Sequence, residues 1–259
     1  MRVERTIDGV RARLADRRAG SVGLVPTMGA LHDGHLALLG AAKAENETVV
    51  MSLFVNQAQF AESSDLARYP RDEGRDLELA AEAGVDVVFA PSHDEMYPPG
   101  FQTWVDVTEV GSILEGRFRP GHFRAVATVV LKLFSIVRPT RAYFGQKDAQ
   151  QVEVIRRLIR DLALEVELRV VPTVRDPDGL ALSSRNALLS PGERHRALAL
   201  SRALATRDRE RALAELASAN GLEIDYLEVA DFEPPVLAGA VRVGSTRLID
   251  NVILEGEAE

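Results

Sequence analysis

The sequence predicts an α/β protein, in which a parallel sheet with helices on both faces precedes a small C-terminal α+β lobe. Three observations carry this prediction. Short apolar runs rich in β-branched residues alternate with segments whose apolar residues recur at helical spacing. The strand–helix units have the length that connects neighbouring parallel strands. After Pro172 this alternation stops, and a polar, turn-rich stretch leads into a long helical segment and further strands.

The first half of the chain supplies the opening strands and helices. The predicted strands there are VGLVPT (22–27), TVVMSLFVN (48–56), VDVVFAP (85–91) and the short TWVDV (103–107). A helix is expected from about Leu36, after the first strand. A second helix is expected over 71–84, because acidic residues gather at its start and Gly84 stands at its end.

A long apolar helix and two more strands complete the sheet. The helix is predicted from His122 to Val137 on apolar residues at helical spacing, namely Phe123, Val126, Val130, Leu133, Phe134 and Val137. RAYFG (141–145) is the next strand, a helix with one apolar face follows, and EVELRVVP (165–172) closes the series. Ligands of such Rossmann-like sheets bind beyond the carboxyl ends of the strands.

The C-terminal lobe is predicted to be small. A loop is expected over 173–186, and one helix of mixed charge is expected over 191–219. The predicted strands of the lobe are LEIDYLEV (222–229) and AVRVGSTRLIDNVIL (240–254). The predicted domains are therefore 1–172, a Rossmann-like ligand-binding domain, and 173–259, the small lobe.

The net charge and composition of the chain argue against several classes of protein. The net charge of −8 over 259 residues argues against a protein that binds a nucleic-acid backbone. The absence of cysteine excludes disulfides, thiolate metal ligands and cysteine nucleophiles, and suits a cytoplasmic protein. The first twenty residues lack the apolar core of a signal peptide, and no apolar run approaches the roughly 20 residues that cross a bilayer. We expect a cytoplasmic protein that binds neither nucleic acid nor membrane.

The stretch PTMGALHDGH (26–35) stands where the first strand turns into a helix. With Asp33 as the N-cap, His35 lies in the first helical turn, and His32 shares its face. Free N–H groups and the helix dipole attract anions there, and Gly29 and Gly34 allow close approach. Two imidazoles can strengthen hydrogen bonds to phosphate as charge develops. The pattern suits nucleotide phosphate chemistry.

Other interpretations of the two histidines stay open at this point. They can simply be solvated at a helix start, and a metal site is a weaker alternative because no third ligand is evident. The chain has neither a GxxxxGK[ST] loop nor a GxGxxG fingerprint. Their absence weakens the hypotheses of a P-loop kinase and of a dinucleotide oxidoreductase.

Six segments in order resemble one family. They are PTMGALHDGH, FVNQAQF, EGRFRPGHFRAVATVVLKLF, FGQKDAQQ, DGLALSSRN and GSTRLIDN, which together reach from about Val25 to Asn251. This set resembles the pantothenate synthetases (pantoate–β-alanine ligases), within the HxGH nucleotidyltransferase superfamily. Each motif alone is a modest signal, but six in order are highly specific.

The resemblance implies a ligase that works in two steps. Pantoate and ATP, with Mg²⁺, give pantoyl adenylate and pyrophosphate, and the amine of β-alanine then gives pantothenate and AMP. It further implies a homodimer, nucleotide and pantoate sites in the first domain, and a small lobe that closes over ATP. It implies no metal held by protein ligands alone.

The resemblance also assigns residues to sites. His32, His35 and Lys147 are the implied catalytic residues, with His35 protonating the leaving pyrophosphate. The implied ATP-binding residues are Met28, Gly29, His32, His35, Gly145, Gln146, Lys147, Asp148, Val174, Leu182, Ser183, Ser184 and Arg185. Gln59 and Gln151 are the implied pantoate-binding residues, Gln59 also faces β-alanine, and Asn56 supports them. Arg119, near Glu115, is assigned to the acceptor side.

The chain departs from the family pattern at two places. Gln57 follows Asn56 where the family usually has proline, which leaves the segment before Gln59 less preorganised. The small lobe also looks short between its strands.

Two other functions compete with the ligase. Another HxGH adenylyltransferase would transfer AMP to a phosphorylated acceptor, without needing Gln59 and Gln151. A nucleotide-sensing protein without turnover would need fewer charged groups than this chain carries. Release of pyrophosphate and AMP from ATP and pantoate, with and without β-alanine, separates the three.

Overall fold

A computed structural model describes residues 1–15, 20–60 and 63–254. The chain divides into two compact units. The first comprises Met1–Phe144 and Val154–Val171, and the second comprises Gly145–Glu153 and Pro172–Glu259. The sequence places the boundary after residue 172; in the structure it follows Val171, and Gly145–Glu153 in addition groups with the C-terminal part.

The first unit is built on a six-stranded sheet. Its strands run in the order β1-β4-β3-β2-β5-β6, and the pairs that flank β2, β3 and β4 are parallel. The strands are β1 (Arg2–Glu4), β2 (Val22–Thr27), β3 (Thr48–Leu53), β4 (Val87–Phe89), β5 (Arg141–Gly145) and β6 (Glu167–Val171). Strand order reverses between β2 and β5, and ligands of such sheets bind beyond the carboxyl ends of the strands at this point.

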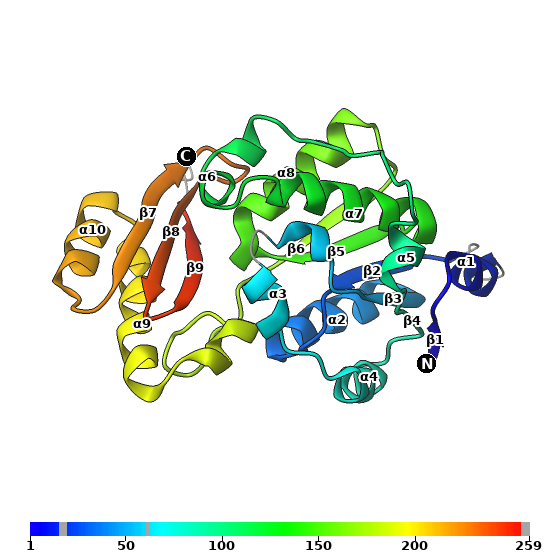
Figure 1. The fold of residues 1–259 in the computed structure, drawn as a ribbon, viewed down its shortest axis with the longest axis horizontal. Coiled ribbons are helices and arrows are strands. Elements are labelled where there is room, and N and C mark those ends of the chain that lie inside the picture. The colour runs from blue at the N-terminus through cyan, green and yellow to red at the C-terminus, as the bar shows by residue number, and fades with distance from the viewer. Residues whose placement is uncertain (16–19, 61–62, 255–259) are drawn as a thin grey trace. The chain divides into compact units, whose positions relative to one another are not determined.

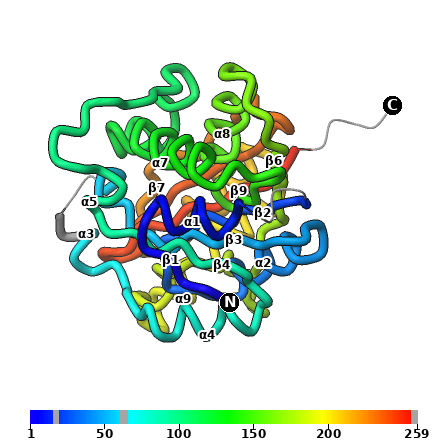
Figure 2. Tube along the Cα trace, turned by 90° about the vertical axis from the view of Figure 1, so that its right-hand side faces the viewer, coloured from blue at the N-terminus to red at the C-terminus, as the bar shows by residue number. Residues whose placement is uncertain are grey.

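Helices cover both faces of this sheet (Figures 1 and 2). On one face, α2 (Asp33–Glu45) and α4 (Glu73–Glu82) pack Leu39 and Ala80 into a core with Val25 and Met51 of the strands. On the other face lie α7 (His122–Val137) and α8 (Ala149–Asp161), with α1 (Ile7–Ala15) beside α7. The predicted fold class, including helices on both faces, is confirmed.

Short helices lie between the longer elements of both units. In the first unit they are η1 (Gln57–Gln59), α3 (Ser63–Arg68), α5 (His93–Met96), η2 (Val110–Ser112) and α6 (Glu115–Phe118), and in the second unit they are η3 (Gln146–Asp148) and η4 (Ser184–Leu188). The sequence predicts none of them, because segments of three to six residues carry too little periodicity to detect.

The second unit contains a three-stranded antiparallel sheet of β7 (Glu223–Ala230), β8 (Val236–Val243) and β9 (Thr246–Ile253). Helices α9 (Pro191–Ala205) and α10 (Arg209–Ser218) pack on it through a core that includes Leu200, Leu204 and Leu216. The small α+β lobe is thus present as expected.

The prediction of a single helix over 191–219 is wrong. The chain leaves α9 at Thr206, Arg207 adopts a left-handed backbone with φ of 54°, and Asp208 caps α10 by accepting from the N–H of Arg211 at 2.8 Å. Because Asp is among the best N-cap residues, Asp208 is the signal that marks the second start.

The prediction of a strand at 103–107 is also wrong. Val105 and Val107 pack beside Phe123 and Ala127, which explains their alternation. The N–H of Val105, however, donates to the hydroxyl of Thr128 at 3.0 Å rather than to a neighbouring strand. The alternation therefore reflects one buried side of an irregular segment.

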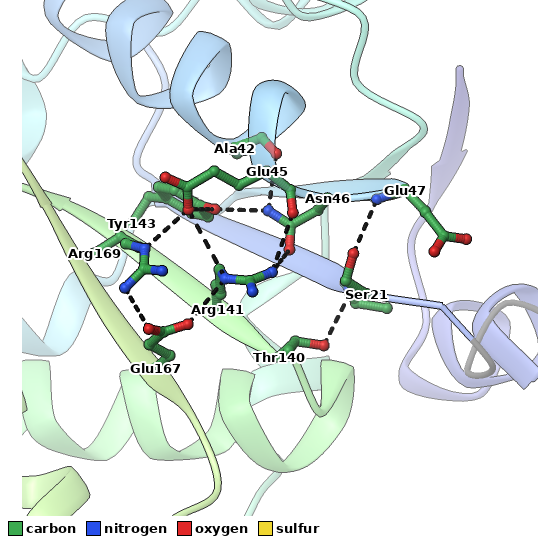
Figure 3. A network of polar contacts seen from close by, with 11 residues as sticks. Ser21, Ala42, Glu45, Asn46, Glu47, Thr140, Arg141, Tyr143, Glu167 and Arg169 are labelled. Carbon is green, nitrogen blue, oxygen red and sulfur yellow. Dashed lines mark hydrogen bonds and ion pairs between the residues drawn. The ribbon is translucent and has the colours of Figure 1, made fainter.

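A polar network fixes the C-terminal end of α2 (Figure 3). The carboxylate of Glu45 accepts from Nε of Arg169 at 2.9 Å and from the hydroxyl of Tyr143 at 2.8 Å. Arg141 donates to the backbone oxygen of Glu45 at 3.1 Å and pairs with Glu167 at 2.9 Å. The hydrogen bond from Arg169 holds the pKa of Glu45 below its usual value. The network joins α2 to β5 and β6.

Among the described residues, no helix is long and apolar enough to cross a membrane.

Candidate active site

The two histidines at the start of α2 cap the helix that they begin. The N–H of Gly34 donates to Nδ1 of His32 at 3.2 Å, and the N–H of His32 donates to Nδ1 of His35 at 3.3 Å. Asp33, the expected N-cap, is instead the first helical residue, because the ring of His32 supplies the acceptor. His35 does lie in the first turn, as expected.

These hydrogen bonds fix which nitrogen of each ring carries a proton. A neutral imidazole whose Nδ1 accepts a hydrogen bond is protonated on Nε2. The ring centroids of His32 and His35 lie 4.2 Å apart, so the two rings that carry these Nε2–H groups are neighbours at the helix start. Such a pair suits an anionic oxygen, and the helix dipole has the same preference.

The turn between β2 and α2 has an unusual backbone. Gly29 and Ala30 both have positive φ, at 84° and 52°. The carboxylate of Asp76, on α4, accepts from the N–H of Ala30 at 2.9 Å and of Leu31 at 2.8 Å. No sequence motif assigns a role to Asp76, although it shares the buried helix face of Ala80 four residues later.

The carboxyl end of β3 leads to Gln59. Asn56 is buried, and its Nδ2 donates to Oε1 of Gln59 at 3.2 Å, which is the support expected of Asn56. The hydroxyl of Tyr97 donates to Oδ1 of Asn56 at 3.0 Å. The backbone oxygen of Gln59 lies 3.0 Å from Nδ1 of His122, which must be the donor because a carbonyl only accepts. Tyr97 and His122 are thus further members of this cluster: Tyr97 lies outside the quoted motifs, and His122 stands within one of them without an assigned role.

Arg119 also reaches Gln59, through a 3.4 Å hydrogen bond from Nη2 to the same backbone oxygen. Its Nη1 lies 3.9 Å from the carboxylate of Glu115, as its place in the sequence suggested. Burial raises the pKa of Tyr97 to about 12, so this hydroxyl stays a neutral donor at ordinary pH.

In the second unit, Asn251 of β9 holds the turn that carries Lys147. Its Nδ2 donates to the backbone oxygens of Gln146 at 2.9 Å and Lys147 at 2.8 Å, and its Oδ1 accepts from Nε2 of Gln146 at 3.1 Å. Nζ of Lys147 lies 3.7 Å from the carboxylate of Asp148. The chain enters this turn from β5, which pairs with β2 in the sheet of the first unit.

Residues 173–186 are more ordered than the expected loop. A narrow hairpin joins Val174 to Leu182, whose N–H donates to the oxygen of Val174 at 3.0 Å. Arg175 makes a two-pronged ion pair with Asp250, at 2.6 and 3.0 Å. Ser183 then caps η4 by accepting from the N–H of Arg185 at 3.3 Å, so the SSRN segment is a short helix start.

The structure brings predicted residues together within each of the two units. Met28, Gly29, His32 and His35 share one turn of the first unit. Gly145, Gln146, Lys147 and Asp148 share one turn of the second, and Val174 and Leu182–Arg185 lie on one hairpin and helix start there. Gln151 lies in the first turn of α8 within the second unit, so its convergence with Gln59 stays a prediction.

Residues 2–253 match the sequence model of the family described as pantoate-beta-alanine ligase. The chain belongs to this family. It is 50% identical to the pantothenate synthetase of Moorella thermoacetica over 280 residues, which cover 98% of the chain and 99% of that protein. It is 52% identical to the pantothenate synthetase of Roseiflexus castenholzii over 278 residues, with coverage of 98% and 100%.

Solved structures agree with this membership. The pantothenate synthetase of Thermus thermophilus matches with a TM-score of 0.93 and 46% identity, over 98% of this chain and 99% of that one. The pantoate-beta-alanine ligase of Francisella tularensis, complexed with beta-gamma ATP and beta-alanine, matches with a TM-score of 0.88 and 36% identity, over 98% and 97%. The protein is a ligase that joins pantoate to β-alanine, and the resemblance recognised in the sequence is confirmed.

The matches do not test the shortness of the small lobe. The alignment to the Moorella protein runs over 280 residues whereas this chain has 259, so the relative carries residues that this chain lacks. The expectation that they belong to the small lobe stays a prediction.

Proposed function

We propose that the protein makes pantothenate through a pantoyl-adenylate intermediate, with the HxGH turn acting on the phosphates of ATP. The observation that carries this proposal is the pair of histidines, whose Nδ1 atoms are engaged by backbone N–H groups and whose protons therefore stand on Nε2. Family membership supplies the reaction.

The first step joins two anions and needs positive groups. A carboxylate oxygen of pantoate attacks the α-phosphorus of ATP, a new O–P bond forms, and the bond to the β-phosphate breaks. Pyrophosphate leaves with the electron pair. His32 and His35 stabilise the oxygens that gain charge by donating hydrogen bonds from their Nε2–H groups. Both rings keep these protons, because a neutral imidazole that lost its Nε2 proton would become an imidazolate, and pyrophosphate leaves as an anion.

The turn after β5 is proposed to bind the same nucleotide. Lys147 neutralises phosphate charge, and Gly145, Gln146 and Asp148 contact the nucleotide or its ribose. On the hairpin, Val174 and Leu182 face adenine, and Ser183, Ser184 and Arg185 contact the phosphates. What supports these roles is the match of each residue to a family motif, together with the ordered turns that carry them.

The second step forms the amide. The neutral amine of β-alanine attacks the acyl carbon of the adenylate, and the C–N bond forms. The bond from the acyl carbon to AMP breaks, AMP leaves with the electron pair, and the extra proton on nitrogen passes to solvent. Gln59 is proposed to contact both pantoate and β-alanine, and Gln151 to contact pantoate. The side chain of Gln59 is held by buried Asn56, as a preorganised contact requires.

Mg²⁺ is proposed to enter with ATP. No group of three or more His, Asp or Glu side chains suited to a metal gathers among the described residues. Mg²⁺ commonly keeps several waters and binds mainly through substrate phosphates. Bound there, the cation would neutralise phosphate charge, and Asp148 is the carboxylate proposed to hold its waters. We also propose a homodimer, on the family resemblance alone.

The proposed route is tested by following both products of ATP. With ATP, Mg²⁺ and pantoate alone, we expect pyrophosphate release limited to enzyme-bound adenylate. Adding β-alanine should give continuous release of AMP and pyrophosphate with equal amounts of pantothenate. An enzyme that transfers AMP to a phosphorylated acceptor would ignore β-alanine. A nucleotide-binding protein without turnover would release neither product.

A further inference from the structure

Asp76 is a buried carboxylate aimed at the backbone of the HxGH turn. It lies in the first turn of α4, is 3% exposed, and accepts from the N–H groups of Ala30 and Leu31 at 2.9 and 2.8 Å. Burying a charge is costly unless polar groups compensate it, and two short hydrogen bonds from N–H groups do so here.

The turn held by these two hydrogen bonds has an energetically unfavourable backbone conformation. Ala30 has a φ of 52°, and a residue with a Cβ adopts this left-handed conformation at a cost. Gly29 before it has a φ of 84°, and a Cβ there would lie 2.7 Å from Oδ2 of Asp76. Successive N–H groups that point at one anion form a compact cradle, and the carboxylate of Asp76 is the anion that fills it.

The turn leads directly into the capping histidines. Leu31, whose N–H is held, is followed by His32, and the N–H of His32 donates to Nδ1 of His35. A turn that shifted would move both rings, because each ring is tied to this backbone. The other side of the turn is fixed by Thr27, whose hydroxyl donates to the backbone oxygen of Ser52 at 2.7 Å.

We infer that Asp76 is a positioning residue for adenylate formation. It clamps the left-handed turn at Ala30 and so sets where His32 and His35 present their Nε2–H groups. This inference rests on the proposed function of the two histidines. It predicts an effect on the step that uses these rings, and none on attack of β-alanine on an adenylate already formed.

Asp76→Asn is the central variant. The asparagine amide has one oxygen that can accept a hydrogen bond, and its NH₂ group faces the second backbone N–H. One of the two hydrogen bonds from Ala30 and Leu31 is therefore lost. We expect pyrophosphate release with ATP and pantoate to slow about 10- to 100-fold, as small misplacements of catalytic groups do. Pantothenate formation from supplied pantoyl adenylate and β-alanine should stay near the parent rate.

Asp86→Asn is the matched control. Asp86 is also a carboxylate of the first unit that accepts from a backbone N–H, that of Val49 at 3.0 Å, and it contacts α2 through Lys43 at 3.3 Å. Both of these contacts lie away from the turn at Ala30. We expect this variant to lose some stability and to keep both half-reactions. The inference fails if Asp76→Asn slows both half-reactions equally, or if Asp86→Asn slows adenylate formation as much as Asp76→Asn does. Asp76 would then contribute only to the stability of the fold.

A measurement without turnover separates this inference from the proposed function. Amide hydrogen exchange in the unliganded parent should show strong protection at Ala30 and Leu31, with faster exchange of these two amides in Asp76→Asn. Fast exchange of both amides in the parent overturns the inference even if Asp76→Asn fails to fold. If the two amides exchange as expected but the parent protein forms no adenylate, the proposed function is wrong. The conclusion that Asp76 holds the turn at Ala30 would still be supported.

Discussion

At the scale of single residues, His35 has two separable tasks. Its Nδ1 accepts from the N–H of His32 and thereby caps α2, while its Nε2–H is proposed to donate a hydrogen bond to the phosphate oxygens that gain charge. Glutamine is a usual residue at the third position of a capping box, because its side chain also accepts from the N-cap N–H. We therefore predict that His35→Gln keeps the fold and loses adenylate formation by a factor of about 10² to 10³.

The check compares His35→Gln with His35→Ala in thermal unfolding and in pyrophosphate release. Alanine removes both tasks, so it should also lower stability, by roughly 0.5–2 kcal/mol for a lost cap. Two variants that are equally inactive but differ in stability would separate capping from hydrogen-bond donation to the phosphates. Parental pyrophosphate release in a folded His35→Gln would remove His35 from the chemistry.

At the scale of elements, Gln57 stands where the resemblance to the family leads us to expect proline. Gln57 is the first residue of η1, is exposed, and follows Asn56, whose extended backbone has a φ of −73° and a ψ of 93°. Proline suits the first position of a helical turn, where its missing N–H costs nothing. Gln57→Pro should therefore stabilise the protein by up to about 1 kcal/mol, by restricting the unfolded chain.

The free energy of unfolding in urea is compared between Gln57→Pro and Gln57→Ala. Both variants lose the glutamine side chain, and only Gln57→Pro gains the proline ring. The KM for pantoate should stay at the parent value. A marked rise in that KM in both variants would instead assign the side chain of Gln57 its own part in the pantoate pocket.

Asn251 shows how one strand of the second unit supports a turn from elsewhere in the chain. It gives both of its side-chain N–H donors to the oxygens of Gln146 and Lys147. Asn251→Ala leaves these oxygens without that donor, at a cost of about 1–3 kcal/mol if they stay buried. We predict lower stability together with weaker ATP binding, because the backbone that carries Lys147 loosens.

Arg242→Ala is the control for Asn251→Ala. It removes an exposed ion pair to Asp225, at 3.1 Å, within the same sheet. Calorimetric titration with a non-hydrolysable ATP analogue should give parental affinity for Arg242→Ala and reduced affinity for Asn251→Ala. If Asn251→Ala bound the analogue as tightly as the parent, Lys147 would not depend on this clamp.

At the scale of the whole molecule, the sequence predicts the parts whose signal is local. β2 and α7 have the bounds expected for them, because an apolar run and a 3.6-residue spacing are properties of the segment itself. β1 escapes prediction, since its three residues gain their partner only from β4, more than eighty residues later. The motifs likewise give His35 and Lys147 as candidates, and their roles stay predictions. Asp76 and His122 make hydrogen bonds to residues distant in sequence, and no short sequence pattern contains such contacts.

Two buried tyrosines tie the stability of the whole molecule to alkaline pH. Burial raises the pKa of Tyr143, in the network at the end of α2 (Figure 3), and that of Tyr97 to about 12. A tyrosine in an unfolded chain titrates near pH 10. Between these values the folded protein keeps both phenolic protons and the unfolded chain releases them. The folded state then binds more protons, so its stability falls as pH rises.

We therefore predict that stability is level up to about pH 10 and then declines toward pH 12, by roughly 2–3 kcal/mol for each tyrosine. Urea unfolding across this range measures the decline. Tyr97→Phe loses its hydrogen bond to Asn56 and Tyr143→Phe those to Asn46 and Glu45, so both variants should be less stable at neutral pH. Each should nevertheless decline less steeply than the parent above pH 10, because a phenyl ring has no proton to release. A double variant that declined as steeply as the parent would show that other groups govern alkaline unfolding.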